Sequence, residues 1–314
     1  MKRRVSGTVV LGLALAGSAC ASSKPSAPAE ASGGGVAAQA KVAQTSGTYV
    51  ERRAQHETSL TREGPITDEW PTEDPPEGAQ KVTFRSGDLE LWGWLAMPPR
   101  GPRGAIVYLH GAFALDRSDF ELVRKFLDND YAVFTPTLRG RNGNPGHLEL
   151  IYGEVDDAAA AVRFTAEQTG LKPESVFVFG HSMGGATVAM LAMRDDLEVG
   201  LTGSCGGIYS VGTYRRWAKS KGNRDLVRFD ATDPDELELR APQPHAATMP
   251  HDHVAYVGDT ESYILDNARA LEAAATGAPG AFELIVIEGD HMSALPAALE
   301  KFYARVQPLS APAM

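Results

Sequence analysis

Ser182 lies in the sequence Gly180-His181-Ser182-Met183-Gly184, which has the spacing of a nucleophilic serine on a tight turn between a strand and a helix. A serine hydroxyl becomes an effective nucleophile when a nearby base takes its proton and a carboxylate orients that base. The flanking glycines leave room for the strained backbone of such a turn. Because glycine is frequent in this chain, an ordinary glycine-rich turn is the alternative.

The base that this chemistry needs is best supplied by His291, one of eight histidines in the chain. It follows the apolar run 284–287 within Gly289-Asp290-His291. If the sheet is parallel, the loop after this run lies at the same sheet edge as the serine turn. The alternative is a histidine that simply lies in solvent on a loop.

Two carboxylates are candidates for the acid that orients this base. Asp259 and Glu261 both follow the apolar run 254–257, between the serine and the histidine in chain order. Either side chain could reach the imidazole of His291. Each could instead be a loop carboxylate or a helix cap.

Acyl transfer also needs two amides that hold the negatively charged oxygen of the intermediate. One is the amide of Met183, the residue after the nucleophile. The other comes from the loop that follows the apolar run 105–109, where we assign Ala112, with Phe113 as the alternative donor. His110, at the start of that loop, is expected to be structural.

Strands and helices alternate along the chain, and this order predicts an α/β fold with a mostly parallel sheet and helices on both of its faces. The first two strands form an antiparallel hairpin before the alternation starts. No metal or cofactor is expected. The expected strands cover 82–85, 89–95, 105–109, 131–135, 176–179, 200–205, 254–257 and 282–287, and the expected helices cover 119–128, 154–168, 183–194, 263–275 and 294–306.

The N-terminal region predicts an exported protein. Residues 1–19 carry three basic residues and then a short apolar run, as an export signal does. Cys20 follows Gly17-Ser18-Ala19 and resembles the lipidated cysteine of bacterial lipoproteins; a plain cleaved signal is the alternative. We expect a lipid-anchored protein of the cell envelope, with a flexible tether over 20–47 and an extended arm over 48–80.

The composition limits the possible partners. The chain has 314 residues, of which 43% are hydrophobic, so it can form a large core. The formal charge is −10, and it becomes more negative when the basic leader is removed, which argues against nucleic acid as a partner. Cys205 is the second of two cysteines, so no internal disulfide is expected if Cys20 is modified or removed.

Four motifs together resemble the α/β-hydrolase superfamily, in particular dienelactone hydrolases and the catalytic domains of prolyl-oligopeptidase-type peptidases. The motifs are His110-Gly111-Ala112, the Arg139-Gly140 turn with its following glycines, the Ser182 turn, and Gly289-Asp290-His291. The resemblance covers 81–307, which implies one catalytic domain with a tail over 308–314. It favours Glu261 as the acid, because glutamate stands where this family usually has aspartate.

The expected activity is hydrolysis of a carboxylic ester through an acyl-enzyme. A peptidase that acts on small peptides is the second possibility, and a non-catalytic surface protein on the same fold is the third. The segment 206–250 is expected to cross the sheet edge as one or two helices. There Tyr209, Tyr214 and Trp217 would offer apolar surface to an acyl or aryl group, and two arginines, Arg215 and Arg216, could accept a carboxylate.

Overall fold

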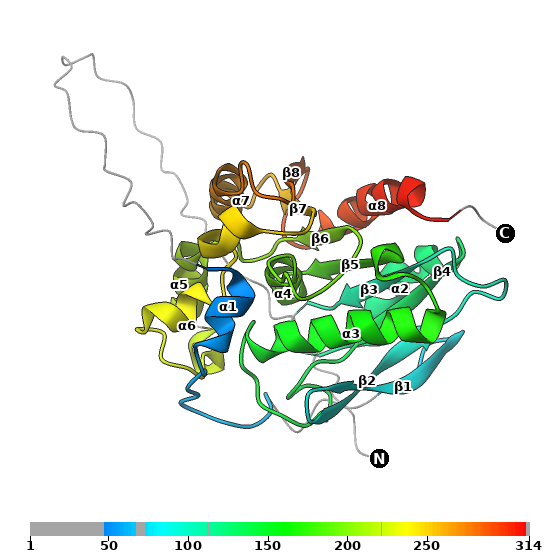
Figure 1. The fold of residues 1–314 in the computed structure, drawn as a ribbon, viewed down its shortest axis with the longest axis horizontal. Helices are drawn as coiled ribbons and strands as arrows, with labels where there is room; N and C mark the ends of the chain where they lie inside the picture. The colour runs from blue at the N-terminus through cyan, green and yellow to red at the C-terminus, as the bar shows by residue number, and fades with distance from the viewer. Residues whose placement is uncertain (1–46, 67–72, 112–113, 221, 312–314) are drawn as a thin grey trace, which may run out of the picture. The chain divides into compact units, whose positions relative to one another are not determined.

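The computed structural model describes residues 47–66, 73–111, 114–220 and 222–311 (Figure 1). The export signal, the modification site at Cys20 and the tether predicted from the sequence lie outside the described residues, apart from Gly47. Both proposed donors on the loop after the third strand, Ala112 and Phe113, also lie outside them.

An eight-stranded sheet forms the centre of the domain, in the order β1-β2-β4-β3-β5-β6-β7-β8. β1 and β2 form the predicted antiparallel hairpin, β2 is antiparallel to β4, and all later neighbours are parallel. The predicted mostly parallel sheet is thus confirmed. The strands are β1 Ala79–Ser86, β2 Leu89–Ala96, β3 Gly104–Leu109, β4 Tyr131–Pro136, β5 Val176–His181, β6 Thr202–Cys205, β7 His253–Gly258 and β8 Phe282–Ile287.

The central strands are apolar throughout because helices cover both faces of the sheet. In β5, Val176 and Val178 pack into one core, while Phe177 and Phe179 pack into the core on the opposite face. The first core also contains side chains of α3, α4 and α7, and the second contains those of α2 and α8. These helices are α2 Arg117–Leu127, α3 Gly153–Thr169, α4 Met183–Leu191, α7 Ser262–Ala274 and α8 Leu295–Val306.

The segment 206–250, hereafter the cap segment, interrupts the alternation between β6 and β7. As expected, it contains two α-helices, α5 Val211–Lys219 and α6 Pro234–Glu238, together with short 3-10 turns. α5 packs on both α6 and α7. The Oγ of Ser210 begins α5 by accepting the N–H of Thr213, and its hydroxyl is also hydrogen-bonded to Asn267 of α7. The cap segment is therefore fixed to the domain beside β7.

The arm departs from the extended conformation predicted for it. It begins with the helix α1 Tyr49–Ala54, which a capping box between Thr48 and Glu51 stabilises. Tyr49 is fully buried with its ring edge-on to His245 of the cap segment. The sequence pattern did not predict this six-residue helix, because proline and polar residues prevail in the rest of the arm. The rest of the described arm pairs with the cap segment through a bridge between Leu60 and Phe229.

Candidate active site

The turn between β5 and α4 places Ser182 in a strained conformation. Its φ is 54° and its ψ is −115°, values that a residue with a side chain rarely adopts. Such strain costs about 1–3 kcal/mol and persists where the surrounding structure fixes it. Here the Ser182 N–H donates to the carbonyl of Cys205 on the neighbouring strand at 2.8 Å. The side chain is half-buried at the end of the sheet.

Two glycines make this sharp turn possible because backbone segments approach them closely. A β-carbon at Gly180 would lie 2.4 Å from the carbonyl carbon of Gly184. A β-carbon at Gly184 would lie 2.1 Å from the carbonyl oxygen of Leu109 on β3. Real side chains do not fit at these distances, so the two positions flanking Ser182 require glycine.

His291 and Glu261 form a hydrogen-bonded pair. Glu261 follows the end of β7, and His291 follows the end of β8. Nδ1 of His291 lies 2.7 Å from Oε1 of Glu261, so the imidazole donates this proton to the carboxylate. The other carboxylate oxygen accepts the N–H of Gly258 at 3.1 Å, and Glu261 is buried. Nε2 of His291 is buried and has no hydrogen-bond partner among the described residues. In this tautomer that nitrogen carries the free lone pair of a base.

Asp259, the second candidate acid, has a different environment. It is exposed, and its Oδ1 accepts the N–H of Gly289 at 3.0 Å. Its own N–H donates to the carbonyl of Ile287 at 2.8 Å. Asp259 therefore links the loop after β7 to the loop after β8, and of the two carboxylates it is Glu261 that meets the imidazole of His291.

His181, directly before the serine, contacts both the ring and the backbone carbonyl of His291. Its ring lies 4.8 Å from the ring of His291, and its Nε2–H donates to the His291 carbonyl at 2.9 Å. Burial and the neighbouring His291 lower the pKa of His181 to about 4, so it is neutral at pH 7. No pattern in the sequence predicted this role of His181; its place inside the serine turn, between Gly180 and Ser182, is the one local signal.

The amide of Met183 is the first of α4, where N–H groups have no partner within the helix. Nearby, a β-carbon on Gly111 would lie 2.9 Å from Nδ1 of His181 and 3.4 Å from Cβ of Ser182. His110 is buried, as expected of a structural residue, and its Nδ1–H donates to the Gly111 carbonyl at 2.9 Å. Burial lowers the pKa of His110 to about 4. The loop after β3 thus begins against the serine.

Three reactive or aromatic side chains, Cys205, Tyr209 and Tyr214, are buried. Burial, with a smaller contribution from Glu261, raises the pKa of the Cys205 thiol to about 12, so it is a neutral thiol at pH 7. Tyr209 and Tyr214 are fully buried and offer no surface to a substrate, in contrast to the expectation from sequence. The ring of Tyr209 packs edge-on against Phe282 of β8, and the ring of Tyr214 packs against Trp217 and Phe229 of the cap segment.

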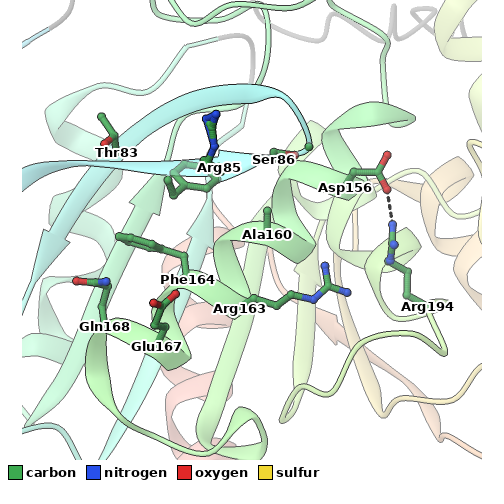
Figure 2. Close-up of a pocket in the computed structure, with 12 residues that line it drawn as sticks. Thr83, Arg85, Ser86, Asp156, Ala160, Arg163, Phe164, Glu167, Gln168 and Arg194 are labelled. Carbon is green, nitrogen blue, oxygen red and sulfur yellow. Dashed lines mark hydrogen bonds and ion pairs between the residues drawn. The ribbon is translucent and has the colours of Figure 1, made fainter.

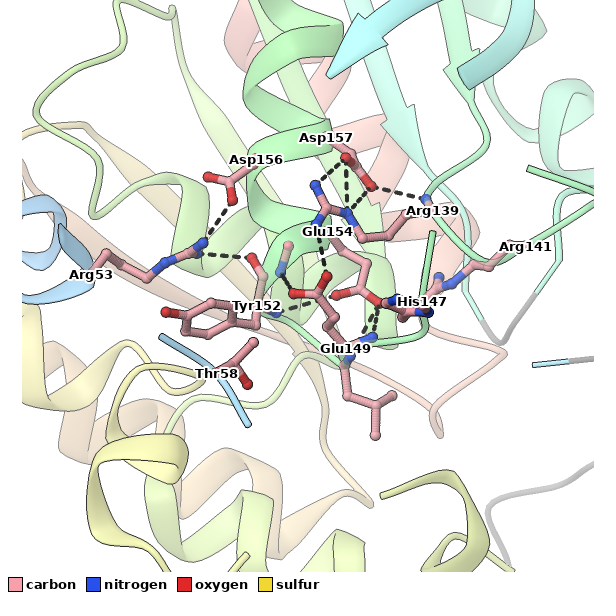
Figure 3. Close-up of polar contacts among 12 residues, drawn as sticks. Arg53, Thr58, Arg139, Arg141, His147, Glu149, Tyr152, Glu154, Asp156 and Asp157 are labelled. Carbon is pink, nitrogen blue, oxygen red and sulfur yellow. Dashed lines mark hydrogen bonds and ion pairs between the residues drawn. The ribbon is translucent and has the colours of Figure 1, made fainter. Parts of the chain in front are cut away.

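The Arg139-Gly140 motif after β4 is a structural ion-pair cluster (Figure 3). Arg139 binds Asp157 through two nitrogens and Glu149 through a third, at 2.8–3.1 Å. Buried Glu154 accepts the N–H groups of Glu149 and Leu150 at 3.0 and 3.1 Å. These contacts hold the loop between β4 and α3 on the side of the domain where the arm packs.

The described surface has hollows away from these residues. One of about 540 Å³ lies between β1 and α3 (Figure 2), and another of about 580 Å³ lies between β8 and α8. Neither is lined by Ser182, His291 or Glu261. Among the described residues, no group of three or more His, Cys, Asp or Glu side chains is arranged to hold a metal ion. Within those same parts of the chain, no helix is both long and apolar enough to cross a membrane.

Comparison with known sequences identifies the family and two distant relatives. A model of the alpha/beta hydrolase family matches residues 106–312. The uncharacterized protein YfhR of Escherichia coli K12 is 27% identical over 131 residues, which cover 39% of this chain and 45% of YfhR. The uncharacterized peptidase YtmA of Bacillus subtilis 168 is 26% identical over 170 residues, covering 51% of this chain and 65% of YtmA. The matches thus span less than two thirds of either relative.

Two solved structures have a similar fold at low sequence identity. The acylaminoacyl peptidase of Pyrococcus horikoshii superposes with a TM-score of 0.60 at 14% identity, over 73% of this chain and 40% of that one. The esterase Est2 of Thermogutta terrifontis, with propionate bound, superposes with a TM-score of 0.57 at 17% identity, over 76% of this chain and 98% of that one. At these identities the similarity concerns the fold.

Proposed function

This chain belongs to the alpha/beta hydrolase family, and from that premise we propose that it is a serine hydrolase that cleaves a carboxylic ester through an acyl-enzyme. The observation that carries the proposal is the arrangement at the sheet edge. Ser182 stands on a strained turn, and the hydrogen-bonded pair His291–Glu261 follows neighbouring strands of the same parallel sheet. These are the three groups that nucleophilic catalysis by serine requires.

In the proposed reaction, Nε2 of His291 takes the proton of Ser182 as the hydroxyl oxygen attacks the ester carbonyl. Glu261 stabilises the resulting imidazolium through its 2.7 Å hydrogen bond to Nδ1. The Met183 amide holds the oxyanion, and Ala112 or Phe113 is proposed as the second donor. His291 then gives its proton to the leaving alcohol, and water activated by the same nitrogen hydrolyses the acyl-enzyme and frees Ser182.

An ester substrate is favoured over a peptide by the extent of the matched domain. The esterase Est2 is covered over 98% of its length, whereas the acylaminoacyl peptidase is covered over 40%. Most of the peptidase therefore has no counterpart in this comparison. A small-peptide peptidase remains the second candidate, because YtmA is named a peptidase and the same catalytic groups serve both reactions.

Covalent labelling and a substrate panel test this proposal. A fluorophosphonate should label the wild-type protein at Ser182, and Ser182→Ala should abolish both labelling and turnover. Among substrates, short-chain p-nitrophenyl esters should exceed matched aminoacyl anilides in kcat/KM by more than their difference in leaving-group reactivity. Labelling of Ser182→Ala at the wild-type rate would refute the nucleophile, and efficient anilide turnover would favour the peptidase.

We also propose that the protein is exported and anchored to a membrane of the cell envelope by lipidation at Cys20. The support is the basic and apolar leader directly before that cysteine. Cys20→Ser should move the protein from the membrane fraction to the soluble fraction, since one lipidated cysteine is the proposed attachment. An unchanged distribution between the two fractions would contradict lipidation there.

A further inference from the structure

The turn that ends β6, residues 205–207, contacts all three groups of the candidate triad. The carbonyl of Cys205 accepts the N–H of Ser182 at 2.8 Å. Gly206 lies close to the other two: a β-carbon on it would be 2.7 Å from Nδ1 of His291 and 3.7 Å from Oε1 of Glu261. Its φ of +62° also favours glycine. A shift of this turn would therefore move the nucleophile relative to the base.

A chain of buried hydrogen bonds begins at Gly207 of this turn. The N–H of Gly207 donates to the hydroxyl oxygen of Tyr209 at 3.2 Å. That hydroxyl lies 2.9 Å from Oγ of Ser204, which lies 2.8 Å from Nε2 of His253. The side chains involved are no more than 1% exposed. The chain continues from Nδ1 of His253 to Oγ1 of Thr202 at 2.9 Å, and from there to the carbonyl of Asp252 at 2.8 Å.

The far end of the chain fixes the direction of every bond in it. A backbone carbonyl only accepts, so Thr202 donates its single hydroxyl proton to Asp252 and must accept from Nδ1–H of His253. Burial lowers the pKa of His253 to about 3, so the ring is neutral and its Nε2 accepts a proton from Ser204. Ser204 in turn accepts from the hydroxyl of Tyr209.

This leaves one arrangement, in which Tyr209 accepts from Gly207 and donates to Ser204. Each hydroxyl in the chain uses one donor and one acceptor, so none can be removed without leaving a buried neighbour unpaired. The chain spans β6 and β7 and ends at the strand-end turn. The positions of its members on two strands and on the cap segment explain why sequence pattern did not reveal it.

We propose that Tyr209 is a positioning residue, whose hydroxyl holds the turn 205–207 in the place that aligns Ser182 with His291. The inference rests on the proposed serine hydrolase function. The hydroxyl of Tyr209 is hydrogen-bonded to Ser204 and Gly207, and it acts on the triad through Gly207 and Gly206. Misplacement of reacting groups by about 1 Å can lower the rate of the chemical step about a hundredfold, whereas binding of a small ester depends little on this alignment.

The cap segment contains two buried tyrosines that allow a matched pair of variants. Tyr209→Phe removes the hydroxyl from the hydrogen-bond chain. Tyr214→Phe removes an equally buried hydroxyl from the same cap segment, where it donates to the carbonyl of Leu150 at 3.2 Å. With a p-nitrophenyl ester, Tyr209→Phe should lower kcat about tenfold and leave KM within about twofold, because alignment and not binding is lost. Tyr214→Phe should leave both constants near the wild-type values.

A third variant and a spectroscopic measurement complete the test. Ser204→Ala cuts the chain one step further from the turn and should lower kcat less than Tyr209→Phe does. In the wild type, ¹⁵N NMR of His253 should show a neutral ring protonated at Nδ1. Ser204→Ala also serves as the test if Tyr209→Phe does not fold. Wild-type kcat in Tyr209→Phe, or an equal loss in Tyr214→Phe, would overturn the inference.

The same measurements separate this inference from the proposed function. If a fluorophosphonate labels Ser182 of the wild type and Tyr209→Phe is labelled equally fast, the function stands and the positioning role is refuted. If the wild-type protein is not labelled, the serine hydrolase function fails and the positioning role fails with it. A slower labelling rate in Tyr209→Phe alone supports both.

Discussion

The sheet edge around Ser182 and the interface between the arm and the cap segment are held together by different kinds of contact. At the sheet edge, backbone segments meet at glycines, and most hydrogen bonds join neutral groups. At the interface, charged side chains make many of the contacts. Within the cap segment, buried Glu236 pairs with Arg240, and the same carboxylate accepts the N–H of Ser59 from the arm at 2.8 Å. Arg52 of α1 reaches Glu238 at 3.0 Å.

This difference predicts that the sheet edge determines the alignment of the catalytic groups, whereas the interface determines the attachment of the arm to the domain. Close backbone contacts fix positions to a fraction of an ångström, so changes at the sheet edge should alter the rate of catalysis. Buried ion pairs contribute little net stability when intact but cost several kcal/mol when one partner is removed. Changes at the interface should therefore alter the free energy of unfolding and leave the rate per folded molecule nearly unchanged.

The largest effect is expected at the carboxylate that meets His291. Glu261→Gln should lower kcat about 10³–10⁴-fold, because an amide can no longer hold the required tautomer and charge of the imidazole. Asp259→Asn should lower kcat less than about tenfold, since Asp259 bonds to the Gly289 amide and not to the ring. Steady-state kinetics of both variants measure this contrast. The reverse ranking would assign the acid role to Asp259.

A smaller effect, on stability alone, is expected at the interface. Arg240→Leu leaves the buried carboxylate of Glu236 without its cation and should lower the free energy of unfolding by about 3–5 kcal/mol. Arg52→Ala breaks ion pairs whose acidic partners are more exposed and should cost less than Arg240→Leu does. Denaturant titration measures both values. A large loss of kcat in folded Arg240→Leu would contradict the separation of alignment from attachment.

The smallest effect is expected at Cys205, which lies at the sheet edge but whose thiol is expected to be unreactive. Its pKa of about 12 makes the thiolate about a thousandfold rarer at pH 8 than in an ordinary cysteine. Iodoacetamide should therefore label the peptide that contains Cys205 in the unfolded protein and leave it nearly unlabelled in the native one. Mass spectrometry of the digested protein measures the ratio. Rapid native labelling would show that the sheet edge opens.

Much of the candidate site could be predicted from sequence because its chemistry restricts residue types locally. A strained serine needs glycine at 180 and 184, and a strand followed by Gly289-Asp290-His291 brings the base to the same edge. The choice between Asp259 and Glu261 could not be made from the residues alone. Two carboxylates two positions apart differ in direction, and only the fold shows which one meets the imidazole.

The arm and the cap segment could not be predicted in the same way. Arg228 donates to the carbonyls of Gly64 and Pro65, which lie more than 160 positions earlier in the chain, and no local pattern indicates such a pairing. The capping box at Thr48 is a local signal, but it starts only a short helix. The burial of Tyr209 and Tyr214 likewise depends on how the cap segment packs on the domain, which the aromatic character of the two residues does not indicate.

The pairing of the arm with the cap segment also determines when these residues of the arm can make their contacts as the chain folds. Residues of the arm are made first, yet Ser59 and Arg52 find their partners only at positions 236 and 238. Contacts so distant in sequence close a large loop, and their entropic cost must be met before they add stability. While the chain is being synthesised, Ser59 and Arg52 cannot make these contacts until the cap segment has been made. The docking of the arm on the cap segment therefore comes after the synthesis of α6.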